Sequence, residues 1–284
     1  MRSTIKIGTW QGPVADNDFH TNLQKVKSVL ENSQNLGLDF LCFPETYLSG
    51  YSVRAIKESA CSLDHPEITR FIDESKKYGT VILVGMSEKV KDQIYNSQLV
   101  VYQGDLLGVA HKTMLTEYDA RYFSTDLSLP IFTAKGIKFG VAICHSTSFV
   151  EPALYLRWKG ARLLFTPHFN NQPPAGFVQN GKAVSFWEHR TMVLNNQAAL
   201  ATLLKMVVVR SNIVMVEPNA LGVGDSAIWD MDGVLLAQGE PFTECLVTAE
   251  FDRQIFLEEH WIDRREVPLA LLDMIAQAAK EYPQ

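Results

Sequence analysis

The sequence predicts an α/β fold in which short buried strands alternate with helices along the whole chain. Two observations support this prediction. Short apolar runs recur along the chain, and the segments between them carry apolar residues at helical spacing. No low-complexity linker interrupts the alternation. Interleaved strands and helices are typical of a layered domain, and a length of 284 residues allows one or two such domains.

The elements of the first half follow from periodicity and from turn residues. Asp64 is expected to cap a helix whose first turn contains His65 and Pro66. In order, we expect a strand at 5–9, a helix with the apolar stripe Leu23, Val26, Val29 and Leu30, a strand at 38–45, the helix after Asp64, a strand at 81–85, and a hairpin of 99–102 and 106–109 whose second strand continues to Lys112.

The second half continues the same alternation. Its least regular part is 169–176, which is a loop by composition, and a helix is expected from Ser185 or Trp187 onward. In order, we expect a strand at 137–144, a helix at 151–156, a strand at 163–167, this loop and helix, and a hairpin of 227–229 and 234–236.

Three of these apolar runs end in a reactive side chain. Glu45, Lys112 and Cys144 each stand at the C-terminal end of an expected strand. Strand ends are where rigid scaffolds usually place chemistry. A thiol on a strand-to-helix turn also lies near backbone N–H groups and a positive helix terminus, which favour a thiolate. Each group alone is more typical of a solvated strand end or a buried apolar thiol, but the combination predicts a catalytic site.

Composition argues against several other function classes. A net charge of −6 argues against nucleic acid bound through general basicity. No apolar run is long enough to span a bilayer, and residues 1–4 lead directly into a strand and not into a signal-peptide core, so we expect a cytoplasmic protein without a membrane partner. The four separated cysteines and seven histidines lack disulfide-framework, CxxC and HxxxH patterns, so no metal is expected.

Several short motifs follow one another in a characteristic order. They are Phe43-Pro44-Glu45 with Gly50-Tyr51, residues 111–115 with 118–123, residues 140–144, residues 160–167, residues 210–216, and residues 224–230 with Asp232-Gly233. In this order they resemble the nitrilase superfamily of carbon–nitrogen hydrolases, and the resemblance spans nearly the whole chain. It implies a four-layer α-β-β-α sandwich, a single domain over residues 1–284, and a homodimer or higher homo-oligomer.

The resemblance also implies a mechanism. Cys144 is the expected nucleophile, Glu45 the general base and Lys112 the positive charge beside the developing oxyanion, assisted by the backbone N–H of His145. No organic cofactor or metal is required. We expect hydrolysis of a small amide; nitrile and N-carbamoyl hydrolysis remain alternatives. A catalytically impaired relative that binds a small molecule or a protein also remains open.

The chain departs from the family pattern at two positions. Many relatives carry a second glutamate after the lysine, and Ala120 stands where this glutamate is expected. Glu117 or Asp119 is a candidate to replace it. Ser146 stands where an acidic residue commonly follows the cysteine. These departures favour the impaired relative, whereas the presence of Glu45, Lys112 and Cys144 favours the enzyme.

Substrate-binding residues are expected around the reactive groups. His168–His189 follows the strand that by resemblance neighbours the Cys144 strand, so Phe169 and Asn170 at its start are expected to line a pocket or its lid. Tyr51, Glu117 and His145 are the further candidates. His145 is not expected to activate Cys144, because adjacent residues on an extended strand end point in opposite directions.

Overall fold

The computed structural model describes residues 2–179, 181–260, 262 and 268–281. The helices are α1 (Phe19–Asn32), α2 (Val53–Glu58), α3 (Pro66–Glu74), α4 (Val150–Trp158), α5 (Phe186–Leu204) and α6 (Leu269–Glu281). The strands are β1 (Thr4–Gly12), β2 (Phe40–Cys42), β3 (Val81–Val90), β4 (Gln93–Tyr102), β5 (Asp105–His111), β6 (Phe132–Ala134), β7 (Ile137–Val141), β8 (Leu163–Pro167), β9 (Phe177–Gln179), β10 (Lys182–Val184), β11 (Val207–Glu217), β12 (Ala220–Val223), β13 (Ala227–Trp229), β14 (Leu235–Gln238) and β15 (Cys245–Asp252).

A single large sheet organises these elements. Among the described residues it contains thirteen strands, with the main order β5-β4-β3-β2-β1-β11-β8-β7-β6. The central strand β1 runs parallel to β2 and β11 and antiparallel to β15. The parallel pairs β2–β3 and β7–β8 flank this centre on either side. The separate pair β9–β10 forms a small hairpin outside the sheet.

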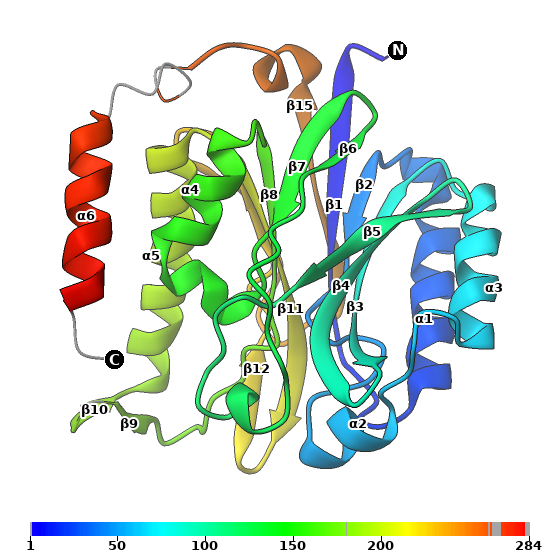
Figure 1. The fold of residues 1–284 in the computed structure, drawn as a ribbon. Coiled ribbons are helices and arrows are strands. Elements are labelled where there is room, and N and C mark those ends of the chain that lie inside the picture. Colours follow the sequence, from blue (N-terminus) through cyan, green and yellow to red (C-terminus); the bar gives the residue numbers. More distant parts are fainter. Residues whose placement is uncertain (1, 180, 261, 263–267, 282–284) are drawn as a thin grey trace.

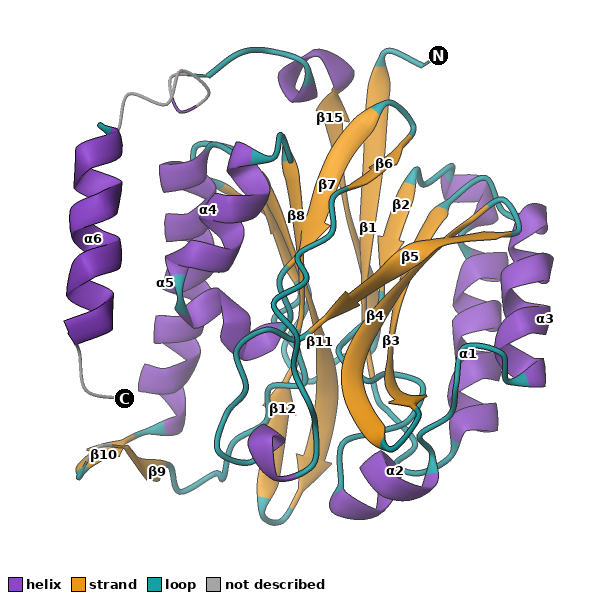
Figure 2. Ribbon diagram, in the orientation of Figure 1, coloured by secondary structure: helices purple, strands orange, loops and turns teal. Residues whose placement is uncertain are grey.

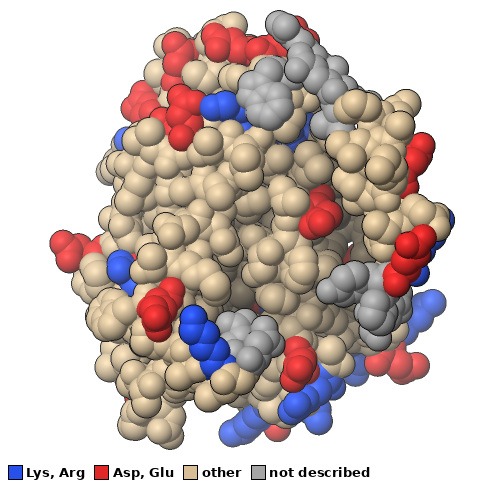
Figure 3. All heavy atoms as spheres, turned by 90° about the vertical axis from the view of Figure 1, so that its left-hand side faces the viewer, with Lys and Arg blue, Asp and Glu red and all other residues tan. Residues whose placement is uncertain are grey.

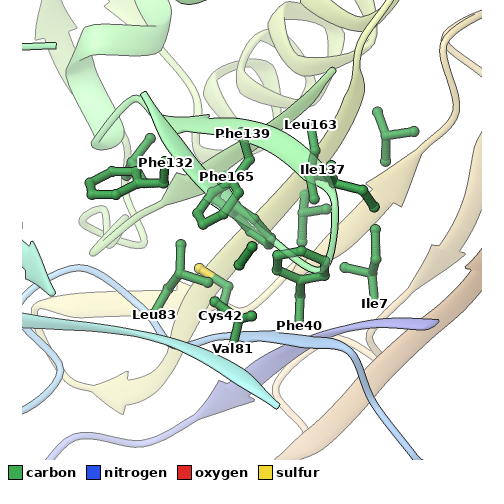
Figure 4. Packing of buried hydrophobic residues seen from close by; sticks show 14 of the residues in the cluster. Ile7, Phe40, Cys42, Val81, Leu83, Phe132, Ile137, Phe139, Leu163 and Phe165 are labelled. Atoms are coloured by element: carbon green, nitrogen blue, oxygen red, sulfur yellow. The ribbon is translucent and has the colours of Figure 1, made fainter. Parts of the chain in front are cut away.

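The two halves of the sheet face each other across an apolar core. Phe40 on β2 contacts Phe139 on β7 and Phe165 on β8, with ring centroids 5.4 and 5.9 Å apart. Figure 4 shows these rings between side chains of both halves, including Leu83 and Ile137. Burial of such side chains stabilises the fold by about 1.5–3 kcal/mol each. The sheet therefore forms the two inner layers of the molecule.

Helices cover the outer faces of both halves (Figure 1, Figure 2). On one side, Leu23 and Leu30 of α1 and Phe71 of α3 are buried in one cluster with side chains of the β1–β5 half. On the other side, Leu156 of α4 and Leu200 of α5 are buried with side chains of β8, β11 and β13. This arrangement confirms the expected four-layer α-β-β-α sandwich.

The structure also corrects three local expectations. His65, and not Asp64, caps α3, because the His65 side chain accepts a hydrogen bond from the Glu67 N–H, whereas Asp64 accepts one from the Ser62 hydroxyl. The strands before the reactive groups end earlier than expected, so Glu45, Lys112 and Cys144 lie on the turns that follow β2, β5 and β7. Finally, the irregular segment before α5 contains the β9–β10 hairpin, which its composition did not indicate.

Candidate active site

The turn that carries Glu45 packs directly against strand β3. A Cβ at Gly85 would lie 2.4 Å from the Thr46 nitrogen and 2.7 Å from the Pro44 carbonyl oxygen, so this close approach requires glycine. The Leu48 N–H donates to the Gly85 carbonyl at 2.9 Å. These contacts fix the backbone on both sides of Glu45.

The Glu45 carboxylate is fully buried and held by donors from three parts of the chain. Its Oε1 accepts hydrogen bonds from Asn96 Nδ2 and from Lys112 Nζ, each at 2.7 Å. Its Oε2 accepts from the backbone N–H of Phe169, also at 2.7 Å. Buried charges persist only when they are paired and hydrogen-bonded, and this carboxylate meets both conditions.

Lys112 is buried and lies between two carboxylates. Its Nζ is 2.7 Å from Glu45 Oε1 and 2.8 Å from Asp119 Oδ2. Burial alone lowers the pKa of Lys112, but the charges of Glu45 and Asp119 and the hydrogen bond to Asp119 outweigh it and raise the pKa. For Asp119, burial raises the pKa, and the charge and hydrogen bond of Lys112 bring it below its usual value. The ammonium therefore stays charged throughout the physiological pH range.

The Tyr51 hydroxyl lies beside both Lys112 and Asp119. It donates to Asp119 Oδ1 and lies 3.4 Å from Lys112 Nζ. Burial, followed by the charges of Glu45 and Asp119, raises the pKa of Tyr51, so the phenol remains a neutral donor. The ring stacks on Phe169 with centroids 4.9 Å apart, and Tyr118 donates to the Tyr51 carbonyl at 3.0 Å.

Cys144 opens a 3₁₀ turn, η4 (Cys144–Ser148), between β7 and α4. Its φ of +46° lies in the left-handed region, which a residue with a side chain occupies only when its surroundings hold it there. Burial and then the Glu45 charge raise the pKa of the thiol to about 12, and the Lys112 charge opposes this rise. The resting thiol is therefore neutral and depends on a base for its deprotonation.

A cavity of about 580 Å³ opens beside these groups. Lys112 and Cys144 line it, whereas Glu45 lies behind them, outside the lining residues. Four of the five substrate-binding candidates also line it: Tyr51, His145, Phe169 and Asn170. Burial and the neighbouring Lys112 charge lower the pKa of His145, which favours a neutral imidazole.

Glu117 does not belong to this group. Its side chain is exposed to solvent and it is not among the residues that line the cavity. Ala120 is exposed as well, so it does not mark a gap beside Lys112. Asp119 occupies that place, because the 3₁₀ turn Asp119–Arg121 directs this side chain inward and the Thr116 N–H donates to its Oδ2 at 2.9 Å. Of the two candidates to replace the missing glutamate, Asp119 and not Glu117 therefore supplies the second carboxylate beside Lys112.

Two buried residues of the site had no clear signal in the sequence. Asn96, in the middle of β4, donates to Glu45, and Gln197 of α5 donates to the Thr147 hydroxyl in η4. Polar residues inside otherwise apolar periodic segments are the one feature that could have pointed to them. Within the described residues no group of histidine, cysteine and acidic side chains is arranged to hold a metal ion. No helix in the same residues is long and apolar enough to cross a membrane.

Comparison with known proteins identifies the class of this chain. The model of the carbon–nitrogen hydrolase family matches residues 6–255. The chain therefore belongs to the carbon–nitrogen hydrolase family, within the nitrilase superfamily. Among solved structures it is similar to Saccharomyces cerevisiae Nit3, a member of branch 10 of the nitrilase superfamily. The TM-score is 0.77 at 20% sequence identity, over 95% of this chain and 96% of that chain, which shows the shared fold.

Individual relatives differ in how much of their length this chain covers. It is 30% identical over 267 residues to a Pseudomonas protegens protein named hydrolase in pqqF 5′ region, and the match covers 92% of this chain and 87% of the relative. It is 27% identical over 256 residues to the glutamine-dependent NAD(+) synthetase of Thermotoga maritima. That match covers 87% of this chain but only 42% of the synthetase.

Proposed function

We propose that this protein hydrolyses a small amide through a covalent thioester on Cys144. The observation that supports this most strongly is the position of Glu45. Its negative charge acts on the neutral thiol and raises the pKa of that thiol, and its carboxylate pairs with Lys112 at 2.7 Å. One carboxylate thus interacts with the thiol that must lose its proton and with the cation that must face the new negative charge.

The proposed reaction has two halves. Sγ attacks the amide carbon while its proton passes to Glu45, and the resulting oxyanion is stabilised by Lys112 and the backbone N–H of His145. Glu45 then gives the proton to the leaving nitrogen, the carbon–nitrogen bond breaks, and ammonia or an amine departs. In the second half, Glu45 takes a proton from water, the hydroxide attacks the thioester, and Cys144 leaves as a thiol with that proton.

An amide is favoured over a nitrile or an N-carbamoyl compound. Asn170, Asn171 and Gln172 line the cavity with neutral groups that both donate and accept hydrogen bonds, as an amide or carboxamide requires. The relative from Thermotoga maritima is named as glutamine-dependent, and glutamine is itself a primary amide. A binding protein without catalysis is less well supported, because Asp119 supplies the second carboxylate that is missing at position 120.

A substrate panel tests the proposal. Aliphatic amides, dicarboxylate monoamides, nitriles and N-carbamoyl amino acids are incubated with the purified protein, and ammonia release is measured. We expect turnover of an amide, its loss in Cys144→Ala and Glu45→Gln, and its retention in Cys61→Ala, which removes a free thiol outside the lining residues. Wild-type ammonia release by Cys144→Ala would refute the nucleophile. Release from nitriles or N-carbamoyl compounds alone would refute the amide.

We further propose that the protein self-associates through the face carried by α4, α5 and α6. Figure 3 shows few charged side chains across much of this face. Large apolar side chains are exposed there, including Tyr155 (45%), Trp187 (60%) and Leu203 (57%), and Met274 (67%) and Ile275 (57%). Contiguous exposed apolar surface is typical of an interface. Light scattering should give a mass of at least two chains, which Leu203→Lys reduces; a monomeric wild type would contradict the proposal.

A further inference from the structure

The nucleophile turn is held from two sides by hydroxyl groups that do not themselves react. On one side, Ser146 Oγ accepts hydrogen bonds from the Met114 N–H at 3.1 Å and from the Thr113 hydroxyl at 3.2 Å, which ties the turn to the segment that follows Lys112. On the other side, the Thr147 hydroxyl donates to the Cys144 carbonyl oxygen at 2.8 Å. Thr147 in turn accepts from Gln197 Nε2 of α5 at 3.0 Å.

The direction of these hydrogen bonds follows from the number of protons available. A carbonyl oxygen can only accept, so the single proton of the Thr147 hydroxyl is used on Cys144. The Gln197 amide must therefore present its NH₂ group, and a flipped amide would place two acceptors against each other. In this orientation Gln197 Oε1 is buried and has no hydrogen-bond donor among the described residues.

Gln197 is not a side chain that only fills the core, because it lines the cavity together with Thr147 and Cys144. Gln197 is fully buried, and its helix is fixed by the apolar packing of Leu200 and Leu204. A bidentate pair of Arg190 with Asp225, at 2.7 and 2.8 Å, also anchors α5. Gln197 thus lies on a helix that is held by these contacts, and through Thr147 it reaches the backbone of Cys144. The φ of +46° at Cys144 requires such support.

We propose that Gln197, acting through Thr147, is a positioning residue for Cys144. The pair fixes the carbonyl of Cys144 and, with it, the direction in which Sγ points toward Glu45 and the substrate. This inference rests on the proposed role of Cys144 as nucleophile. Neither Gln197 nor Thr147 exchanges a proton with the substrate. Their loss is expected to lower kcat more than it raises KM, because a misplacement of about 1 Å costs ~10²-fold in rate.

The test compares variants that remove the hydrogen bonds with one that restores them. Thr147→Val and Gln197→Met keep the approximate size of the side chains and remove the hydroxyl and the amide donor. We expect each to lower kcat by roughly 10- to 100-fold at nearly constant KM. Thr147→Ser keeps the hydroxyl and should retain kcat within about 3-fold. Thr202→Val is the matched control. Thr202 lies on α5, as Gln197 does, but its hydroxyl donates to the carbonyls of Ala198 and Asp232.

The double variant and Cys144→Ala separate the possible outcomes. If Gln197 acts through Thr147, the double variant should be no slower than either single variant; additive losses would overturn the relay. Wild-type kcat in Gln197→Met would also overturn the relay. This variant does not change the turn, so it still provides the test if Thr147→Val fails to fold. Cys144→Ala is assayed in parallel. Turnover retained there refutes the proposed nucleophile, whereas its loss with unimpaired Gln197→Met refutes only the positioning role.

Discussion

Lys112 Nζ lies 2.8 Å from Asp119 Oδ2, and this ion pair is almost completely removed from solvent. The same ammonium pairs with Glu45, so two carboxylates share one cation. Two buried carboxylates close to one another would repel without Lys112 between them. The arrangement therefore lets Glu45 stay available to the thiol while Asp119 holds the position of the ammonium.

Replacing Asp119 should impair turnover without removing the nucleophile. Asp119→Asn keeps the size of the side chain but removes the charge that fixes Lys112, and we expect kcat to fall by roughly 10- to 100-fold. Ala120→Glu should give no gain, because Ala120 is exposed and the second carboxylate is already present. Steady-state kinetics on the amide identified by the panel measure both effects, with the exposed change Asp105→Asn as control. Higher kcat in Ala120→Glu would contradict this account.

Titration of the thiol should separate the two roles of Glu45. Burial and the Glu45 charge raise the pKa of Cys144 to about 12, so the thiolate is scarce near neutral pH. Glu45→Gln removes that negative charge and leaves Lys112 nearby, so the pKa of Cys144 should fall even though turnover is lost. Ultraviolet thiolate absorbance across pH, taken as the difference from Cys144→Ala, measures the shift. An unchanged or higher pKa in Glu45→Gln would show that Glu45 does not act on the thiol electrostatically.

Substrate recognition should depend on the start of the segment before α5 and not on its hairpin. Asn170 lines the cavity, whereas Val178 on β9 is 71% exposed and is not a lining residue. Asn170→Ala should raise KM or change the ranking of substrates, with little effect on thermal unfolding. Val178→Ser is the matched control and should leave kinetics unchanged. Equal effects of the two changes on KM would remove Asn170 from the recognition surface.

The histidine beside Lys112 should make stability depend on pH. His111 Nδ1 lies 2.9 Å from Asp126 and Nε2 lies 3.0 Å from Glu88, while Tyr95 stacks on its ring. Burial lowers the pKa of His111, but the two carboxylates outweigh it and raise the pKa above 6.5. A raised native pKa means that the stabilisation is fully present below pH ~6.5 and is lost as pH rises through the native value.

His111→Gln should therefore lower the free energy of unfolding most at acidic pH, and its difference from wild type should narrow as pH rises. Denaturant unfolding at several pH values between about 5.5 and 9 measures this difference. His20→Gln is the control, since His20 forms an exposed pair with Glu67. A difference that stays constant with pH would mean that His111 acts only through packing.

Local patterns in the sequence were sufficient to predict many of the elements and to select Glu45, Lys112 and Cys144 as candidates. The strands that became β1, β3, β8 and the hairpin β4–β5 were predicted because apolar periodicity and turn residues act over a few neighbouring positions. The same local patterns predicted that Glu45, Lys112 and Cys144 stand where strands end, and the structure places them on the turns that follow β2, β5 and β7. The resemblance to a family then supplied the four layers, which periodicity alone does not determine.

Contacts between distant segments were decided only by the tertiary structure. Asp119 and not Ala120 or Glu117 faces Lys112, because one step along a 3₁₀ turn rotates a side chain from the interior to the solvent. Asn96 and the Phe169 N–H reach Glu45 across 51 and 124 residues, and Gln197 reaches Thr147 across 50. Such partners have no local signature, since a buried polar side chain is chosen by the group it must satisfy when the layers pack together.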